Sequence, residues 1–301
     1  MADDLHEYLR SRQALVTEYL RTQLRAGGDG VWPAALAAAM AYSLLAPGKR
    51  LRPLLVLMAA EAAGGREAHA LPAAAAVEMI HTYSLIHDDL PAMDDDDLRR
   101  GLATCHKKFG EALAILAGDA LLTLAFDVLA SAYPPATAAA CCRELARGAG
   151  AAGMVGGQVE DLASEKQGGS VEALTNIHAL KTGALFRACL RLGLLSAQGE
   201  RPGGPEPAMV QSLEGYGRCL GMVFQITDDL LDVESTAEQT GKRTQKDAAR
   251  GKLTYPGLLG LDESRRRARD LVREAEEHLR PLAAAAQRLT ALIEYILARD
   301  R

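Results

Sequence analysis

The sequence has few aromatic residues and no excess of positive charge. Aromatic residues make up 4% of the 301 residues, so the chain carries few of the side chains that β-strands favour. The formal net charge of −5 gives no general electrostatic reason to bind nucleic acid or an anionic membrane. Any anionic ligand must therefore be bound by a local group of cations.

Cysteine is also scarce. The five cysteines form no C-x-x-C pair, which argues against disulfides and against a zinc site. The start, "MADDLHEYLRSRQ", lacks the basic segment followed by an apolar one that is typical of a secretory signal. We therefore expect a cytoplasmic protein with reduced cysteines. Asp119 and Asp127 interrupt the most apolar stretch, residues 112–132, which favours a buried core helix and no membrane span.

Alanine-rich runs such as "AALAAAMAY" and "PLAAAAQRL" favour closely packed helices. Gly and Pro interrupt the helical periodicity at residues 25–33, 45–53, 62–65, 131–135, 166–170 and 198–207. None of these breaks is long enough for a domain linker. The pattern predicts one all-α domain over residues 1–301, with about ten or more helices and a cofactor site in the bundle core.

The stretch "LIHDDLPAMDDDDLRRG", residues 85–101, contains the first acidic cluster. Pro91 cannot continue a helix without losing a backbone hydrogen bond, so the preceding helix should end or kink near Leu90. An unbroken helix would place Asp94 about 120° away from Asp88 around the axis. A break lets the loop fold back, so that both carboxylates can reach the same ion. Asp95, Asp96 and Asp97 could help to bind the ion, but a solvent-exposed acidic loop explains them equally well.

The second acidic cluster lies in "FQITDDLLD", residues 224–232. Asp228 and Asp232 are four residues apart and so share one face of a helix, roughly 6 Å apart along the axis. Oxygen ligands suit magnesium or calcium. A solvated acidic helix end is the usual explanation of such a pair, but the apolar residues on both sides argue against it. For the first cluster, a calcium-binding loop is the competing metal site, but that stretch lacks the D-x-D-x-D-G order and the closing glutamate of an EF-hand.

Cations follow or accompany both clusters. Arg99 and Arg100 come directly after the first, and Mg²⁺ characteristically binds carboxylates together with phosphate oxygens, which Arg matches with paired donors. Further cations beside predicted loops are Lys49, Arg50, Arg52, Lys181, Lys242, Lys246 and Lys252. Each alone would be an ordinary surface cation. Together with two carboxylate clusters, they predict a pocket for two polyphosphate groups.

These motifs, with "GKRLRP", "GGQVEDL", "KTGALF" and "GKLTYPGLLGL", resemble the short-chain trans-prenyltransferases, in particular the bacterial farnesyl diphosphate synthases. The resemblance covers about residues 40–265. It implies an all-α isoprenoid synthase fold, a homodimer, and two aspartate motifs that face each other across a central cavity. It also implies several Mg²⁺ ions, and condensation of isopentenyl diphosphate with dimethylallyl or geranyl diphosphate to give farnesyl diphosphate and diphosphate.

The resemblance also assigns residues. The metal ligands would be Asp88, Asp89, Asp94, Asp228 and Asp232. The allylic diphosphate would be held by Arg99, and isopentenyl diphosphate by Gly48, Lys49, Arg52, His81 and Arg100. The departing diphosphate and the cation would be surrounded by Lys181, Thr182, Gln225, Lys242 and Lys252. Chain length would depend on Tyr83 and Ser84, since an aromatic residue five positions before the first motif goes with farnesyl-length products.

Four further positions match the family with less definite roles. Gln158 and Asp161 would support the cavity wall, and Arg299 and Arg301 could either close over isopentenyl diphosphate or fray. Gln245 stands where the family commonly has glycine, which leaves the roles of Lys246 and Asp247 open.

Three other functions remain to be distinguished. A geranylgeranyl diphosphate synthase would use the same scaffold. A non-catalytic partner subunit would not need intact paired motifs. A terpene cyclase would use an aspartate-rich helix, but it has no need of the isopentenyl site at Lys49, Arg52 and His81. The leading hypothesis is farnesyl diphosphate synthesis, in which Mg²⁺, Lys and Arg stabilise the charge that develops on departing diphosphate.

Overall fold

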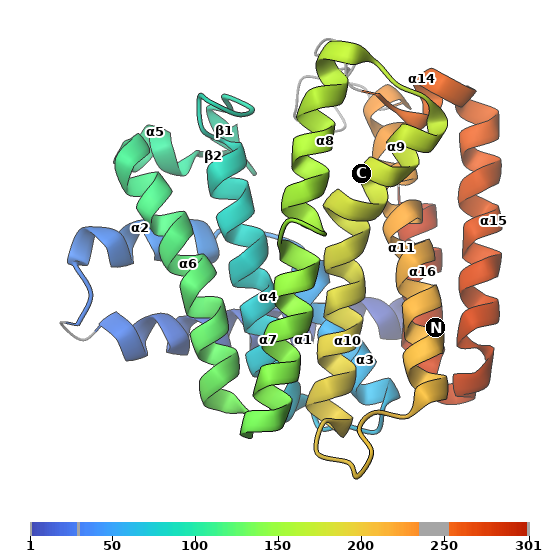
Figure 1. The fold of residues 1–301 in the computed structure, drawn as a ribbon, viewed down its shortest axis with the longest axis horizontal. Helices are drawn as coiled ribbons and strands as arrows, with labels where there is room; N and C mark the ends of the chain where they lie inside the picture. Colours follow the sequence, from blue (N-terminus) through green and yellow to red (C-terminus); the bar gives the residue numbers. More distant parts are fainter. Residues whose placement is uncertain (1, 29–30, 235–252, 300–301) are drawn as a thin grey trace.

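A computed structural model describes residues 2–28, 31–234 and 253–299 of the chain (Figure 1). The first part of the chain forms helices α1 (Ala2–Gly28), α2 (Ala34–Leu44), α3 (Leu51–Ala62) and α4 (Glu67–Asp88). Next come β1 (Leu98–Arg99), β2 (Leu102–Ala103), α5 (Cys105–Phe109), α6 (Glu111–Ala132), α7 (Pro135–Ala149) and α8 (Met154–Gln167).

The second half is also helical. It contains α9 (Val171–His178), the π-helical turn η1 (Ala179–Gly183), α10 (Ala184–Gln198) and α11 (Pro207–Glu234). After the residues that the structure does not describe come α14 (Tyr255–Leu259), α15 (Leu261–Leu279), the 3₁₀ turn η2 (Arg280–Ala286) and α16 (Gln287–Ala298).

The helix boundaries agree with the predicted breaks. Helices end at Leu44, Ala62, Ala132, Gln167 and Gln198, each within or next to a Gly- or Pro-containing break. One break is shorter than predicted, because α3 begins at Leu51 and contains Pro53. A proline is tolerated in the first turn of a helix, where the backbone N–H would have no intrahelical partner.

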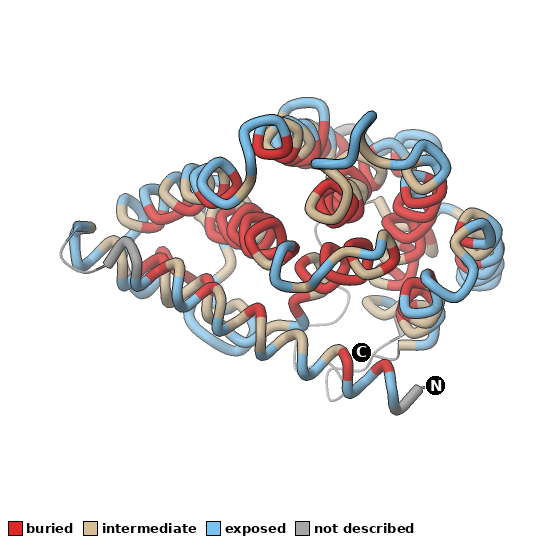
Figure 2. Tube along the Cα trace, turned by 90° about the horizontal axis from the view of Figure 1, so that it is seen from below, coloured by how far each residue is buried: buried red, intermediate tan, exposed pale blue. Residues whose placement is uncertain are grey.

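Helices α4 and α11 position the two acidic clusters. In Figure 1 both helices run upward, so their carboxyl-terminal ends lie at the same end of the molecule. Small buried residues, Ala73 to Ala76, let neighbouring helices pack closely around α4. Figure 2 shows that buried residues concentrate on the inner helices, while the outer helices expose their far faces. The two clusters are thus carried by well-packed elements rather than by a free surface.

A two-stranded hairpin lies between α4 and α5, where only a loop was expected. Leu98 pairs with Ala103 and Arg99 with Leu102 in antiparallel register. Arg100 and Gly101 form the turn with φ values of 54° and 79°, and positive φ at both central residues is the signature of the type I′ hairpin turn. Arg99 lies in the strand and Arg100 in the turn, so their side chains have different partners: Asp89 for Arg99 and the carbonyl oxygen of Pro47 for Arg100.

The apolar stretch predicted as a core helix forms α6, which packs on α4. By length and composition alone α6 could cross a membrane, and 39% of its most apolar window is buried. One face is therefore in the core, as predicted, but Ile115 and Leu116 on another face are exposed. All five cysteines are free, and four of them are buried, in agreement with the prediction of reduced thiols.

Candidate active site

The loop after α4 folds back onto the end of that helix. The backbone N–H of Asp94 donates to the carbonyl oxygen of Asp88 at 2.8 Å, and that of Asp96 donates to Asp89 at 3.2 Å. Asp95 allows this turn with a φ of 48°, a left-handed conformation that Asp adopts more readily than most residues. The predicted return of Asp94 toward Asp88 is confirmed at the level of the backbone.

Asp88 lies in a polar but largely buried setting. Its Oδ1 accepts a hydrogen bond from Gln158 Nε2 at 3.1 Å, so the glutamine of "GGQVEDL" contacts the first motif directly. Burial raises the pKa of Asp88 to about 6; the charge of Lys181 opposes this effect, whereas that of Asp94 adds to it. A bound cation would relieve the repulsion between these two carboxylates.

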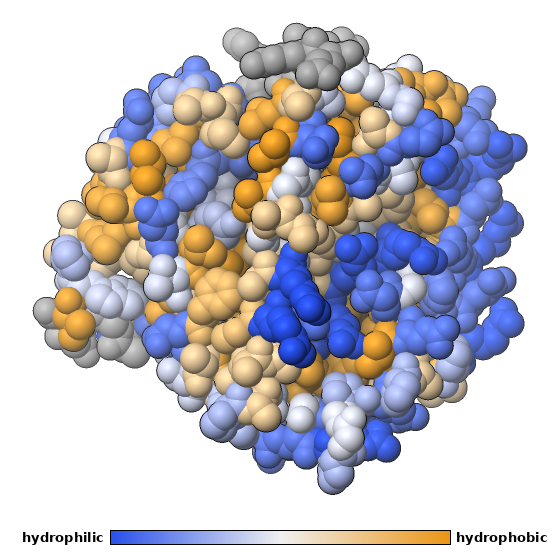
Figure 3. All heavy atoms as spheres, viewed as in Figure 1, coloured by the Kyte–Doolittle hydropathy of each residue, from blue (hydrophilic) through white to orange (hydrophobic). Residues whose placement is uncertain are grey.

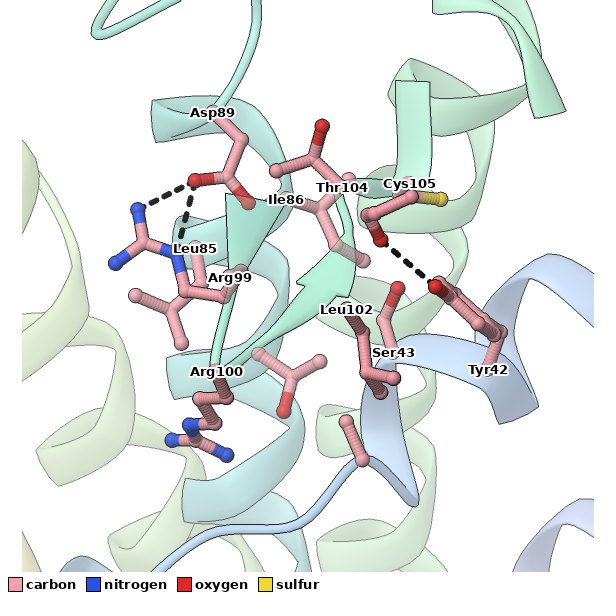
Figure 4. Close-up of a pocket in the computed structure, with 13 residues that line it drawn as sticks. Tyr42, Ser43, Leu85, Ile86, Asp89, Arg99, Arg100, Leu102, Thr104 and Cys105 are labelled. Atoms are coloured by element: carbon pink, nitrogen blue, oxygen red, sulfur yellow. Dashed lines mark hydrogen bonds and ion pairs between the residues drawn. The ribbon is translucent and has the colours of Figure 1, made fainter. Parts of the chain in front are cut away.

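The side chain of Asp89 points toward Arg99 of the hairpin (Figure 4). It is 3% exposed, and its Oδ1 accepts from Arg99 Nε at 2.9 Å and from a second nitrogen of the same guanidinium. Burial raises the pKa of Asp89, and the hydrogen bond from Arg99 lowers it. Its assignment as a metal ligand stays a prediction, and the contact that it makes here fixes Arg99.

The π-helical turn η1 presents Lys181 and Thr182 next to α8 and α11. A Cβ atom at Gly157 would lie 2.2 Å from the backbone nitrogen of Lys181, so α8 can approach η1 this closely only with glycine there. Lys181 Nζ donates to Asp161 Oδ2 at 2.6 Å, and Thr182 Oγ1 donates to Gln225 Oε1 at 2.7 Å. The predicted pair Thr182 and Gln225 thus connects η1 with the helix that carries the second motif.

Arg52 and His81 form the centre of the predicted isopentenyl site. Arg52 Nη1 lies 3.2 Å from His81 Nε2, and its guanidinium stacks 5.0 Å from the centre of the Phe186 ring. Burial, followed by the charge of Arg52, keeps the pKa of His81 well below its ordinary value. His81 is therefore neutral, and because Arg can only donate, Nε2 of His81 accepts this hydrogen bond.

The loop before α3 completes this group. Arg100 Nη1 donates to the carbonyl oxygen of Pro47 at 2.9 Å, and a Cβ atom at Gly48 would lie 2.1 Å from the same nitrogen. Gly48 is thus the residue that lets the guanidinium of Arg100 lie against the loop. Burial raises the pKa of Asp228, and the charges of Arg299 and of exposed Lys49 oppose this rise, which places Lys49 on the side of the second motif.

In the second motif the two adjacent aspartates again point to different partners. Asp228 forms an ion pair with Arg299, whose guanidinium also donates to the carbonyl oxygen of Phe224 at 3.0 Å. Asp229 is buried, and its Oδ2 accepts from the backbone N–H of Tyr255 at 2.8 Å. Asp232 lies one turn after Asp228 on the same helix, as the spacing predicted.

The two predicted chain-length residues lie on α4 just before the first motif. Tyr83 is 7% exposed and packs edge-on against His87, with 5.7 Å between ring centres. Burial raises the pKa of Tyr83, and so does the charge of Asp88, which places its phenol near the metal end of the helix. Ser84 donates to the carbonyl oxygen of His81 at 2.9 Å, so its hydroxyl is used within the helix.

These contacts connect most of the predicted residues into one region at the upper end of α4, η1 and α11. Residues that fall outside the described chain are Lys242, Gln245, Lys246, Asp247, Lys252 and Arg301. Sequence reasoning counted Arg50 among the cations of the phosphate pocket, but the structure buries it against Glu78. It gave no role to Glu78 or to the buried His178, because their partners are far away in the chain.

A second group of possible metal ligands lies elsewhere, between α11 and α15. Ligand atoms of Cys219, Glu274 and His278 come within 4.8 Å of one another. Arg218 already lies among them, 2.6 Å from Glu274 and 3.3 Å from His278. The guanidinium of Arg218 supplies the positive charge that a metal ion would otherwise bring to this cluster. Burial raises the pKa of the Cys219 thiol to about 12, which disfavours the thiolate that a metal would bind. The cluster is accounted for by contacts within the protein.

Comparison with known proteins agrees with this geometry. The family model described as polyprenyl synthetase matches residues 33–293. The chain is 49% identical over 269 residues to farnesyl diphosphate synthase of Escherichia coli (strain K12), covering 87% of this chain and 88% of the relative. It is 48% identical over 275 residues to geranylgeranyl pyrophosphate synthase 9, chloroplastic, of Arabidopsis thaliana, covering 89% and 75%.

Solved structures give the same result. The apo crystal structure of a FPP/GFPP synthase from Zymomonas mobilis superposes with a TM-score of 0.86 at 37% identity, covering 99% of this chain and 100% of the other. That of a geranyltransferase from Legionella pneumophila superposes with a TM-score of 0.85 at 33% identity, covering 98% of each. The all-α isoprenoid synthase fold is thereby confirmed. The chain belongs to the polyprenyl synthetase family, and it is a prenyltransferase that condenses isopentenyl diphosphate with an allylic diphosphate.

Proposed function

We propose that the main product of this prenyltransferase is farnesyl diphosphate. The observation that carries the proposal is the position of Tyr83. This aromatic residue is buried, and burial together with the charge of Asp88 raises the pKa of its phenol. A chain that grows away from the first motif along α4 meets this side chain before it can lengthen further. Geranylgeranyl diphosphate is the alternative product, because relatives of both kinds match this chain.

Magnesium is the proposed metal. The family needs a divalent cation, and the described donors at the two motifs are carboxylate oxygens, which hard cations prefer. Asp88 and Asp94 would hold the metal at the first motif, and Asp228 and Asp232 at the second. Bound there, Mg²⁺ would supply positive charge for the allylic diphosphate.

The protein's own cations would share the charge of the departing diphosphate. Lys181 is aimed by Asp161 and lies near enough to Asp88 to lower its pKa, so it belongs to the same electrostatic group as the first motif. Arg99, fixed by Asp89, would hold the allylic diphosphate from the hairpin side. Preorganised charges of this kind accelerate a reaction because they stabilise charge where it develops.

Isopentenyl diphosphate would be bound by Gly48, Lys49, Arg52, His81 and Arg100. Neutral His81 accepts from Arg52 and so keeps a donor for a phosphate oxygen. Phe186 and Phe224 pack edge to face, with 5.3 Å between ring centres; Phe186 is fully buried under Arg52, and partly buried Phe224 would contribute to an apolar wall. An apolar wall keeps water from the allylic cation.

The chain is proposed to be a cytoplasmic homodimer. Leu98 and Leu102 of the hairpin are 66% and 39% exposed, and Ile115 and Leu116 of α6 are 43% and 56% exposed. Figure 3 shows apolar residues gathered on this part of the surface. A second copy of the chain would cover such a patch. Sedimentation velocity tests this assignment, and a monomer at micromolar concentration would contradict it.

The product assignment is tested with Tyr83→Ala. Removing the ring opens space beside α4, so we expect the main product to shift from fifteen carbons to twenty or more, while the dependence on Mg²⁺ is unchanged. Tyr83→Phe is the matched control and should keep the fifteen-carbon product, because it retains the ring. Chromatography of the dephosphorylated products gives the answer. A fifteen-carbon product from Tyr83→Ala would show that another side chain limits the length.

A further inference from the structure

A buried ion pair lies beneath the proposed isopentenyl site. The side chains of Arg50 and Glu78 are each 2% exposed, and Arg50 Nη1 lies 2.5 Å from Glu78 Oε1. The other terminal nitrogen of Arg50 donates to the carbonyl oxygen of Ala46 at 2.9 Å. The guanidinium of Arg50 is therefore directed into the protein, although its neighbours Lys49 and Arg52 are proposed to bind substrate.

The backbone around Arg50 depends on this pair. Arg50 has a φ of 52° and directly precedes α3, and this left-handed conformation is unfavourable for a residue with a side chain. The carbonyl oxygen of Gly48 accepts from Gln13 Nε2 of α1 at 2.5 Å, and that of Pro47 accepts from Arg100. The loop before α3 is therefore fixed on two sides. The ion pair connects it to α4 in the interior, and hydrogen bonds from Gln13 of α1 and Arg100 of the hairpin hold its other side.

Glu78 also counters the repulsion between the substrate-site cations. It lies on α4 three residues before His81, and its negative charge raises the pKa of both Arg52 and Arg100 against the larger, lowering effect of burial. Arg50 and Arg99, in contrast, lower the pKa of Arg100. Without substrate, four arginines share this small region, and a buried carboxylate among them offsets their mutual repulsion.

We infer that Glu78 is a positioning residue for isopentenyl diphosphate, an inference that rests on the proposed assignment of Gly48, Arg52 and Arg100 to that substrate. Through Arg50 it fixes the loop that carries Gly48 and Lys49. As a buried counter-charge it holds Arg52 and Arg100 in place before the diphosphate arrives. Glu78 itself does not contact substrate.

The test is Glu78→Gln, which keeps the shape of the side chain and removes its charge. We expect KM for isopentenyl diphosphate to rise about 10-fold, while kcat and KM for the allylic substrate stay within about 2-fold of wild type. Glu144→Gln is the matched control, since Glu144 pairs with Arg147 and Arg191 away from the site. It should leave all three constants unchanged.

A double variant separates positioning from stability. Arg50→Met/Glu78→Met removes both buried charges, and such replacements commonly keep or increase stability. We expect urea unfolding to show wild-type stability while KM for isopentenyl diphosphate stays about 10-fold raised. A wild-type KM in a stable double variant would overturn the inference. A lower KM for isopentenyl diphosphate in Glu78→Gln would also overturn the inference, because it would show that the negative charge of Glu78 only weakens the attraction between the arginines and the diphosphate.

The inference and the proposed function fail in different ways. Arg52→Ala, measured in the same assay, tests the assignment of the cations. If Arg52→Ala leaves KM for isopentenyl diphosphate unchanged, the proposed assignment is wrong, and the inference falls with it. If Arg52→Ala raises that KM and Glu78→Gln does not, only the inference is overturned.

Discussion

The two aspartate-rich motifs are similar in sequence but differ in how the protein holds them. The first begins where α4 ends; Asp89 pairs with Arg99, ten residues further on, and Asp88 accepts from Gln158 of α8. The second lies within the unbroken helix α11, and the counter-charge of Asp228 comes from Arg299, 71 residues away. The first motif is held by its own loop and hairpin, whereas the second depends on the far end of the chain.

The comparison also reveals a shared division of roles. In each adjacent pair the second aspartate faces the protein, Asp89 toward Arg99 and Asp229 toward the backbone of Tyr255. The first aspartate of each pair, Asp88 or Asp228, is the one proposed to face the metal. In the proposed function, each D-D pair would thus combine a metal ligand with a residue that contacts the protein.

The largest expected effect comes from removing the first aspartate of either motif. Asp88→Ala or Asp228→Ala should lower kcat at least ~100-fold, because each loses charge that stabilises the departing diphosphate. Asp97→Asn is the control, since exposed Asp97 pairs only with Lys107 among the described contacts, and it should stay near wild type. Steady-state kinetics with Mg²⁺ measure this effect. Near wild-type turnover in either alanine variant would contradict the metal assignment.

The next prediction separates the cations on the two sides. Lys181→Ala should chiefly lower kcat, by about 10-fold to 100-fold, because Lys181 belongs to the group around the departing diphosphate. Arg52→Ala should chiefly raise KM for isopentenyl diphosphate. Initial rates with each substrate varied in turn distinguish the two. If both variants changed kcat and KM alike, the division between leaving-group and isopentenyl sites would be wrong.

A smaller effect tests the supporting role of Asp229. Asp229→Ala leaves the buried N–H of Tyr255 without its acceptor, so we expect the free energy of unfolding to fall by about 1–3 kcal/mol. Because Asp228 stays in place, the metal concentration for half-maximal activity should change little at a temperature where the variant is folded. Urea unfolding and a metal titration measure the two quantities. A large shift in metal requirement with unchanged stability would make Asp229 a ligand instead.

The last effect appears only at low pH, on the same side of the molecule. Burial lowers the pKa of His178, which packs beside Tyr255, to about 4. The folded-state pKa lies below the unfolded value, so the unfolded chain takes up the proton first as pH falls. Stability is therefore lost between pH 6.5 and about 4, by up to about 3 kcal/mol. His178→Gln should flatten this part of the stability curve in urea unfolding, and an unchanged slope would contradict the account.

Much of the first motif was predictable because the residues that determine its shape are close together in the sequence. Pro91 must end the helix, and a return of Asp94 toward Asp88 follows from the break; both features are present. The spacing of Asp228 and Asp232 on one helix was equally local. The turn at Arg100 and Gly101 was missed, because a two-residue strand carries too little alternation to be distinguished from a loop.

Contacts between distant parts of the chain could not be predicted. Arg50 looked like one more substrate cation in "GKRLRP", and only the fold shows that it points at Glu78, 28 residues away. Likewise, the letters "TDDLL" alone do not show that Asp228 and Asp229 have different partners. Only the fold shows that the backbone N–H of Tyr255 donates to Asp229. The assignments of Lys242 and Lys252 stay predictions, since they lie outside the described residues, and so does the single domain over residues 1–301.

The most direct measurement is product analysis of the wild-type enzyme. Purified protein is incubated with radiolabelled isopentenyl diphosphate and geranyl diphosphate, with Mg²⁺ or with EDTA, and the dephosphorylated products are separated by chain length. The account predicts a fifteen-carbon product with Mg²⁺ and none with EDTA. A main product of twenty carbons would contradict the role of Tyr83, and product formation with EDTA would contradict the role of the two aspartate motifs.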